Sequence, residues 1–458
     1  MATLVDRSAA NTQWAGGAKG ATMTGRAGAV PGWEKKRWRV LVSGILVVVM
    51  VTSCTGNSHR DIDPPGWGFT HTQFSADAGD ADAVDTAVKA ISEVPMIQAQ
   101  HIMGFGADNP ESSPGQFNFD SLDRRMDFIR RTGGIPVIIL CCAPDWMKGG
   151  RPGTTDWDRL ETAPLREHFA DFAALSAVVA KRYPYVRHFI VWNEFKGFFD
   201  DVKNRWDAAG YTDLYNAVYD ALKSVNPANQ VGGPYLDFDH PSDPSYTSLD
   251  LRGPWGAVDQ RVLDAFVEWN QRRRGVDFVV VDGHATVSEG VADEFAALEK
   301  FTAVNDWLRK QVSVPIWWAE WYVEPTRPDW TPQHRIALRV AAMIKLASSG
   351  ASVVLYWNPR PESAVCAVCL WTDTQKPGGG QPLPFLTDVL ARFARSFPPN
   401  IPRSTVQVGD GLLALASQRA LVIVNTTGVT ASASVDGRRI DVSPYEVRWL
   451  AAHAGTWS

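Results

Sequence analysis

The feature that most constrains the fold is a regular alternation of strand-like and helix-like segments between residues 66 and 395. Each expected strand is a short run of apolar, β-branched and aromatic residues, which is typical of a buried parallel strand. We expect strands at 66–73, 95–103, 135–142, 187–193, 230–236, 277–283, 314–319 and 351–357. The helices between and after them are expected at 81–93, 119–132, 165–182, 211–225, 258–274, 292–310, 332–349 and 386–395.

Eight such units over roughly 330 residues predict an α/β fold, a (β/α)8 TIM barrel. A doubly wound sheet is the alternative, but no Gly-rich phosphate-binding loop follows the first strand. Beyond residue 403 the segments become short strands separated by Gly and Asp turns, expected at 406–408, 412–417, 420–425, 432–435 and 446–450. We therefore expect a barrel at 61–400 and a small β-sandwich-like module at 401–458.

Residues 1–60 have the pattern of a disordered N-terminus followed by a signal peptide and a tether. Lys35–Arg39 supplies positive charge, and the uncharged run Val40–Val51 is shorter than the roughly 20 residues of a membrane span. The run ends in Val51-Thr-Ser-Cys54, which resembles a bacterial lipobox with Cys54 as the lipidated residue. An uncleaved signal anchor is the alternative. Either reading predicts export, with tethering to the outer surface of the cell membrane; a secreted form is also considered.

The other cysteines and the charge exclude several classes of site. Cys141 and Cys142 are adjacent at a strand end, and Cys366 and Cys369 form a single C-x-x-C. A zinc site needs a second pair at matching spacing, so we expect no metal. Export favours a disulfide between Cys366 and Cys369. The net charge of -5 comes without a basic stripe, so we expect no nucleic-acid partner, and the chemistry below requires no cofactor.

Two glutamates follow two of the expected strands. Glu194 ends the segment Arg187-His-Phe-Ile-Val-Trp-Asn-Glu194, and Glu320 ends Val314-Pro-Ile-Trp-Trp-Ala-Glu320. A carboxylate beside a buried strand is unfavourable unless it has a partner or a function. Strand-end residues of a barrel point into one shared mouth, and retaining glycoside hydrolysis needs two carboxyl groups roughly 5–5.5 Å apart there. The two glutamates are therefore the predicted catalytic pair.

Trp192-Asn193-Glu194 together with Glu320 resembles the retaining glycosidases of clan A. The detail is most similar to glycoside hydrolase family 39, which includes β-xylosidases, α-L-iduronidases and exopolysaccharide hydrolases, over about residues 66–450. The resemblance implies Glu194 as the acid/base and Glu320 as the nucleophile. An ionised Glu320 is expected to raise the pKa of Glu194, because like charges resist joint ionisation. Asn193 is expected to bind the sugar 2-hydroxyl.

Further substrate-binding candidates also lie at or just beyond strand ends, and they are His101, Trp146, His284, Tyr322 and Trp357. The resemblance implies sugar contacts for the two histidines and a tryptophan at the position of Trp357. From their positions, the two tryptophans are expected to form walls of the sugar pocket, and Tyr322, two residues beyond Glu320, is expected to hydrogen-bond the nucleophile. The family usually has an aromatic residue where this chain has Thr286, so the resemblance does not identify the sugar.

The sequence thus predicts an exported retaining glycosidase that acts on an oligo- or polysaccharide. A transglycosylase that uses the same residues is one alternative. A surface carbohydrate-binding protein without catalysis is the other, although such a protein has no need of two buried carboxylates. The long segments 237–256 and 359–384 follow strands and are expected to shape the cleft.

Overall fold

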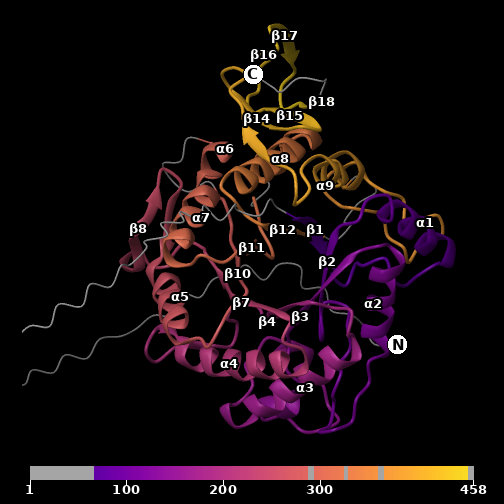
Figure 1. Cartoon of the computed structure of the whole chain (residues 1–458), viewed down its shortest axis with the longest axis vertical. Helices are drawn as coiled ribbons and strands as arrows, with labels where there is room; N and C mark the ends of the chain where they lie inside the picture. Colours follow the sequence, from indigo (N-terminus) through magenta and orange to yellow (C-terminus); the bar gives the residue numbers. More distant parts are fainter. Residues whose placement is uncertain (1–65, 287–292, 324–328, 359–365, 452–458) are drawn as a thin grey trace, which may run out of the picture. The chain divides into compact units, whose positions relative to one another are not determined.

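The computed structural model describes residues 66–286, 293–323, 329–358 and 366–451. At its centre eight parallel strands close into a barrel in the order β1-β12-β11-β10-β7-β4-β3-β2 (Figure 1). Their bounds are Gly66–Thr70 (β1), Ile97–His101 (β2), Ile135–Leu140 (β3), His188–Val191 (β4), Gln230–Asp237 (β7), Phe278–Asp282 (β10), Ile316–Trp318 (β11) and Val353–Trp357 (β12). The predicted (β/α)8 barrel is confirmed.

Helices surround the strands as a ring (Figure 1). Their bounds are Ala81–Ile91 (α1), Asp120–Arg131 (α2), Phe169–Arg182 (α3), Ala208–Val225 (α4), Gln260–Arg272 (α5), Glu294–Ala297 (α6), Glu299–Gln311 (α7), Pro332–Ser348 (α8) and Ala391–Ser396 (α9), the last preceded by a π-helical turn at Phe385–Leu390. Side chains cap several first turns: Asp80, Asp207 and Asp259 each accept a hydrogen bond from a backbone N–H of the helix that follows. Such caps satisfy amides that have no partner within the helix.

The seam between β1 and β2 depends on a glycine. Gly68 pairs with Ile97 across the seam. A Cβ atom at residue 68 would lie 1.8 Å from the carbonyl oxygen of Ile97, so no larger residue fits there without a shift of the backbone. This close approach lets the first strand join both β2 and β12 and complete the barrel.

The C-terminal module consists of a four-stranded antiparallel sheet and a two-stranded sheet. The first contains Arg403–Thr405 (β13), Leu412–Ser417 (β14), Ala420–Asn425 (β15) and Val447–Ala451 (β18), and the second contains Ala431–Val435 (β16) and Arg438–Val442 (β17). The strand expected at 406–408 instead lies at Arg403–Thr405, and β17 was not predicted. The architecture is consistent with the predicted β-sandwich module.

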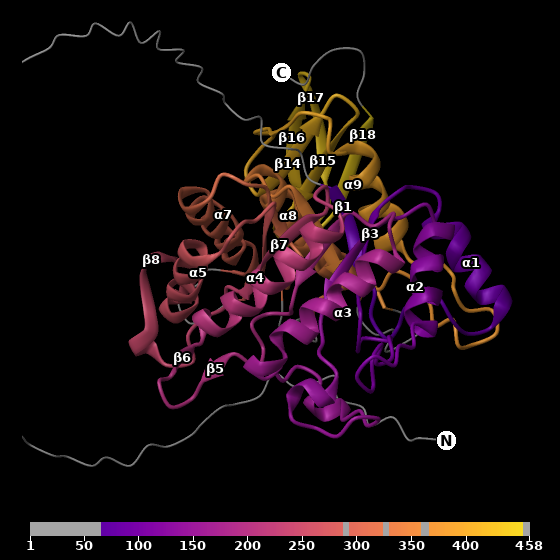
Figure 2. The ribbon, with the colours of Figure 1, turned by 60° about the horizontal axis from the view of Figure 1, so that its bottom comes forward.

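The module packs against α8 and α9 of the barrel (Figures 1 and 2). The Trp449 ring lies 5.3 Å from the ring of Phe393, and the Tyr445 ring stacks on His334 at 3.9 Å. Leu415 and Val422 belong to the same hydrophobic cluster as the barrel core. The module therefore covers apolar surface that the barrel alone would expose.

Two hairpins extend from strand ends of the barrel (Figure 2). One pairs Phe199–Asp200 (β5) with Arg205–Trp206 (β6), shortly after β4. The other pairs Thr247–Gly253 (β8), inside the segment expected at 237–256 to shape the cleft, with Gly256–Asp259 (β9), which begins where that segment ends. Of the second such segment, 359–384, residues 359–365 lie outside the described residues.

The predicted disulfide between Cys366 and Cys369 is present, with its sulfur atoms 2.02 Å apart. A second disulfide, which the sequence did not predict, joins the adjacent residues Cys141 and Cys142 at the end of β3. No helix in the described ranges is long and apolar enough to cross a membrane. The predicted signal peptide and the lipidation site Cys54 lie outside the described residues.

Candidate active site

Glu194 lies in a turn directly after β4 whose backbone has an unusual conformation. Trp192, Glu194 and Phe195 have φ angles of 68°, 49° and 54°, in the left-handed region that non-glycine residues rarely adopt. Packing holds them there: the buried Trp192 donates its indole N–H to the carbonyl oxygen of Lys196, and the Phe195 ring lies 3.9 Å from that of Tyr211. Such strain occurs where the surrounding structure fixes a functional residue.

Glu320 is two residues past β11, and its side chain is only 3% exposed. The Tyr235 hydroxyl donates a hydrogen bond of 2.5 Å to Oε1 of Glu320, and the Tyr322 hydroxyl donates to Oε2. One carboxyl oxygen each of Glu194, Asp282 and Glu320 lie within 4.8 Å of one another. The predicted pair therefore meets at a separation close to that of a retaining glycosidase.

Tyr235 reaches Glu320 because it occupies a β-bulge. The register between β7 and β10 shifts there: Pro234 pairs with Val280, Leu236 pairs with Val281, and Tyr235 has no opposite residue. Its φ of 58° is also left-handed. A bulge redirects a side chain, and bulges are frequent beside active sites. Tyr235 was not predicted as a site residue, although glycines and a proline inside a strand, here Gly232-Gly233-Pro234, are a signal for a bulge.

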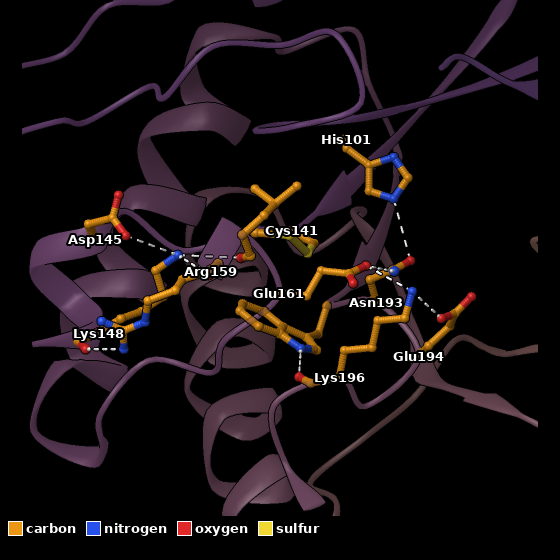
Figure 3. The surroundings of a disulfide bond; sticks show 12 residues. His101, Cys141, Asp145, Lys148, Arg159, Glu161, Asn193, Glu194 and Lys196 are labelled. Atoms are coloured by element: carbon orange, nitrogen blue, oxygen red, sulfur yellow. Dashed lines mark hydrogen bonds and ion pairs between the residues drawn. A yellow bond between two sulfur atoms is a disulfide. The ribbon is translucent and has the colours of Figure 1, made fainter. Parts of the chain in front are cut away.

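Lys196 connects the acid/base candidate to a second carboxylate (Figure 3). Its ammonium lies 2.6 Å from Oε2 of Glu194 and 2.9 Å from Oε1 of Glu161. Glu161, in the loop between β3 and α3, also accepts a hydrogen bond of 3.2 Å from Nδ2 of Asn193. Neither Lys196 nor Glu161 was predicted, because a single charged residue in a loop has no distinctive sequence signal.

His101, the last residue of β2, lies next to this group (Figure 3). Its Nε2 is 3.5 Å from Oδ1 of Asn193. Burial lowers the pKa of His101 to about 3, so the ring is neutral and donates this hydrogen bond from Nε2. The His101 ring packs against Phe105 at 4.3 Å, and Phe105 lies edge-to-face with Trp357 at 5.4 Å. His101, Asn193 and Trp357 therefore form one side of the site.

His284 and Tyr322 form another side. Their rings stack at 4.6 Å with an interplanar angle of 15°. The same Tyr322 donates to Glu320, and Nδ1 of His284 lies 3.7 Å from Oδ2 of Asp239. The predicted hydrogen bond from Tyr322 to Glu320 is thus present in the structure.

Trp146 is the predicted site residue that the structure does not join to the others. It lies in a short helical turn after β3, donates its indole N–H to the carbonyl oxygen of Glu111, and meets His168 edge-to-face at 5.3 Å. None of its described hydrogen bonds or ring contacts involves Glu194 or Glu320. The turn at residues 145–148 directs the indole toward the loop that contains Glu111, and the contacts of Trp146 support that loop.

The pKa shifts of Glu194 and Glu320 differ from the prediction. Burial and the charge of Glu194 raise the pKa of Glu320 to about 8, although both tyrosine hydroxyls oppose that rise. Burial, the largest single influence, favours the protonated form of Glu194, but the ammonium of Lys196, the neighbouring Asp282 and His284 together lower the pKa of Glu194. The expected raised pKa of Glu194 was therefore wrong for the ligand-free site, because the sequence did not reveal the ion pair with Lys196.

A further acidic group lies beside the pair. One carboxyl oxygen each of Asp237 and Asp239 and one ring nitrogen of His284 lie within 4.8 Å of one another. The buried ammonium of Lys300 is 3.5 Å from Oδ1 of Asp239 and supplies positive charge there. Three carboxyl groups, those of Asp237, Asp239 and Asp282, lie in or shortly after β7 and β10. This wall of the barrel mouth is therefore strongly acidic.

Comparison with known proteins gives a family and a fold. The model of the family Glycosyl hydrolases family 39 matches residues 103–360, more than half of the chain. No curated protein matches.

Solved structures share the fold at low identity. One is a GH39 β-xylosidase from Caulobacter crescentus, with 18% identity, a TM-score of 0.50, and coverage of 82% of this chain and 79% of that one. Another is a GH30 endoxylanase from Clostridium papyrosolvens, with 12% identity, a TM-score of 0.53, and coverage of 86% and 97%. SrfJ from Salmonella typhimurium gives 12% identity, a TM-score of 0.56, and coverage of 86% and 90%.

Proposed function

The chain belongs to glycosyl hydrolases family 39, a family of retaining glycosidases, and on that premise we propose that Glu320 is its nucleophile and Glu194 its acid/base. The enzyme then hydrolyses O-glycosidic bonds of an oligo- or polysaccharide by double displacement. The observation that carries the proposal is the meeting of the two carboxyl groups, with oxygens within 4.8 Å, at the ends of separate barrel strands.

In the first step Glu320 attacks the anomeric carbon while Glu194 gives a proton to the leaving oxygen. In the second step Glu194 removes a proton from water, which displaces Glu320 from the sugar. The hydroxyls of Tyr235 and Tyr322 hold both oxygens of Glu320 and fix the direction of attack. Hydrogen-bond donors held in place before the reaction stabilise charge without reorganisation.

The surrounding residues fit a bound sugar ring. Asn193 lies between His101 and Glu161 and is proposed to bind the sugar 2-hydroxyl. Trp357 is partly exposed at the end of β12 and offers an aromatic face, with Tyr322 stacked on His284 on the other side. No step needs a metal or an organic cofactor.

We propose that the enzyme is exported and held at the outer membrane surface by lipid on Cys54. The support is the sequence alone: the basic segment, the short apolar run and Val51-Thr-Ser-Cys54. Growth with an alkyne-tagged fatty acid should label the wild-type chain and not Cys54→Ala. Labelling of both chains, or of neither, contradicts the anchor without affecting the proposed chemistry.

The reaction is tested with the full-length chain in detergent. A screen of aryl β-xylosides, β-glucosides, β-galactosides, α-arabinosides and α-iduronides, with cell-envelope polysaccharides, should identify the accepted sugar. The matching 2-deoxy-2-fluoro glycoside should then inactivate the enzyme and leave the sugar on Glu320, seen by peptide mass spectrometry.

The variants Glu194→Gln and Glu320→Gln should each lower kcat at least about 1,000-fold, since each removes an essential step. Glu268→Gln, on the outer surface of α5, is the matched control and should behave as wild type. Product formed by transfer to a second sugar would favour the transglycosylase, and sugar binding without turnover would favour the binding protein. Label on a residue other than Glu320 would contradict the assignment.

A further inference from the structure

We infer that Asp282 is a third carboxyl of the active site, which shares a proton with Glu194 and supplies it for acid catalysis. This inference rests on the proposed function of Glu194. Asp282 is the last residue of β10, and it is 1% exposed. One of its oxygens lies within 4.8 Å of the Glu194 and Glu320 carboxyls. It thus faces the acid/base candidate inside the barrel mouth.

The contacts of Asp282 are unusual for a buried carboxylate. In the described part of the chain, no N–H or O–H group donates a hydrogen bond to either of its oxygens. The carboxyl of Glu194 lies beside it, with one oxygen of each group within 4.8 Å of the other. Two carboxyl groups this close inside a barrel mouth are most stable when they share a proton, because like charges oppose their joint ionisation.

The charges around Asp282 favour the protonated form. Burial, then the charges of Glu194 and Asp237, raise the pKa of Asp282 well above its usual value. The ionisable groups that it meets electrostatically from neighbouring elements are Glu194, Tyr235, Asp237, Lys300, Glu320 and Tyr322. The Lys300 ammonium is directed to Asp239, and Lys196 pairs with Glu194, so neither cation neutralises Asp282 directly.

A shared proton resolves the conflict that Lys196 creates. Lys196 favours ionised Glu194, yet an acid catalyst must hold a proton. In the proposed first step, Asp282 passes its proton to Glu194. Glu194 gives a proton to the leaving oxygen as the glycosidic bond breaks and Glu320 bonds to the sugar. Asp282 is then ionised, and Glu320, which attacks in its ionised form, has lost its charge in the ester.

The second displacement reverses these changes. Water gives a proton to Glu194 as its oxygen bonds to the anomeric carbon and Glu320 leaves. Glu194 returns that proton to Asp282. Each half keeps the total charge of the three carboxyl groups constant, which matters in a buried site where any added charge is unfavourable. Asp282 acts through Glu194 and is a positioning and proton-holding residue.

The test uses the full-length enzyme and two substrates with the same sugar, a dinitrophenyl glycoside and a disaccharide. The dinitrophenyl group leaves without a proton, whereas the disaccharide needs one. Asp282→Asn keeps the size and a donor N–H but cannot transfer a proton. We expect its kcat/KM to fall at least about 100-fold for the disaccharide and less than about fivefold for the dinitrophenyl glycoside. The alkaline limb of the pH profile of kcat/KM for the disaccharide should move to lower pH.

Two further comparisons separate proton transfer from structural damage. Asp277→Asn, near the opposite end of β10, removes the charge that pairs with Lys223 and should affect both substrates equally. Lys196→Gln, combined with Asp282→Asn, should restore part of the disaccharide activity, because Glu194 then retains its own proton. If Asp282→Asn does not fold, Asp282→Glu and Asp282→Gln form the replacement pair, and only Glu should retain disaccharide cleavage.

Equal losses for both substrates, with an unmoved pH profile, would overturn the inference and leave the proposed function standing. A wild-type enzyme that cleaves neither substrate, nor any in the screen, would overturn the proposed function and this inference with it.

Discussion

The hydroxyl of Tyr235 donates a hydrogen bond of 2.5 Å to Oε1 of Glu320, from a bulge in β7 two barrel strands away from β11. Both carboxyl oxygens of Glu320 therefore accept a hydrogen bond, because the Tyr322 hydroxyl donates to Oε2. The two hydrogen bonds oppose the rise in the pKa of Glu320 that burial and the charge of Glu194 cause.

Replacing Tyr235 with Phe should therefore raise the pKa of Glu320 further and misalign it. A hydrogen bond to a charged group contributes about 1.5–3 kcal/mol, so kcat/KM should fall about 10- to 100-fold. The measurement is steady-state kinetics on the substrate found in the screen. Tyr215→Phe, which removes a buried hydroxyl bonded to the carbonyl oxygen of Gly275, is the control and should retain full activity. Equal activity of both variants would contradict the assigned role.

Replacing Lys196 with Gln should move the alkaline limb of the pH–activity profile to higher pH. The ammonium lowers the pKa values of both Glu194 and Glu320, so its removal lets the pair keep its last proton longer. The profile of kcat/KM between about pH 4 and 10 shows the shift. Lys203→Gln, which breaks a pair with Asp200 in the β5–β6 hairpin, should leave the profile in place. A limb that moves to lower pH in Lys196→Gln would show that the ion pair is not what holds Glu194 ionised.

Glu320→Gln should gain stability over wild type as pH rises. The pKa of Glu320 is raised from 4.5 to about 8, so its contribution to folding is fully present below pH 4.5 and lost as pH rises through about 8. At about 1.4 kcal/mol per pH unit, the free energy of unfolding of the variant relative to wild type should increase by several kcal/mol between pH 5 and 8. Urea unfolding at both pH values measures it. A difference that does not change with pH would mean that Glu320 titrates normally.

Gly68→Ala should destabilise the barrel by about 3 kcal/mol or more, because the added Cβ would collide with the carbonyl oxygen of Ile97 in the β1–β2 seam. Gly115→Ala is the control: its φ of +72° is strained for alanine, but nothing lies within 4 Å of the added atom, so about 1 kcal/mol is expected. Thermal unfolding compares the two. Similar losses would show that the seam relaxes easily.

Trp449→Ala should lower the unfolding temperature of barrel and module together. The Trp449 ring packs against Phe393 and Phe397, so its loss leaves a gap between β18 and α9 worth about 2–4 kcal/mol. Val429→Ala, on an exposed loop of the module, should have no effect. Calorimetry should show one transition for the wild type. Two separate transitions, with only the smaller one moved, would show that the module folds independently of residues 61–400.

Several parts of this protein follow from local sequence patterns. Strands buried on both faces are short runs of apolar, β-branched and aromatic residues, which helices and loops lack. The eight barrel strands and their alternation with helices were therefore predictable. Strand ends of a barrel share one mouth, so Glu194 and Glu320 were predicted together without any contact being known. The same rule found His101, His284, Tyr322 and Trp357, which the structure places around the pair.

Other parts depend on which residues from distant segments come into contact, and only the tertiary structure decided them. Trp146 follows a strand like the others, but the turn after β3 directs it to Glu111 and His168. Tyr235 and Asp282 reach Glu194 and Glu320 through a bulge and a strand end on neighbouring strands. The pKa order of Glu194 and Glu320 depends on burial and on neighbouring charges, among them the Lys196 ammonium 2.6 Å from Glu194. Sequence determined that Glu194 and Glu320 follow separate barrel strands and share one mouth. Packing determined the distances of a few ångströms that set charge and hydrogen bonding.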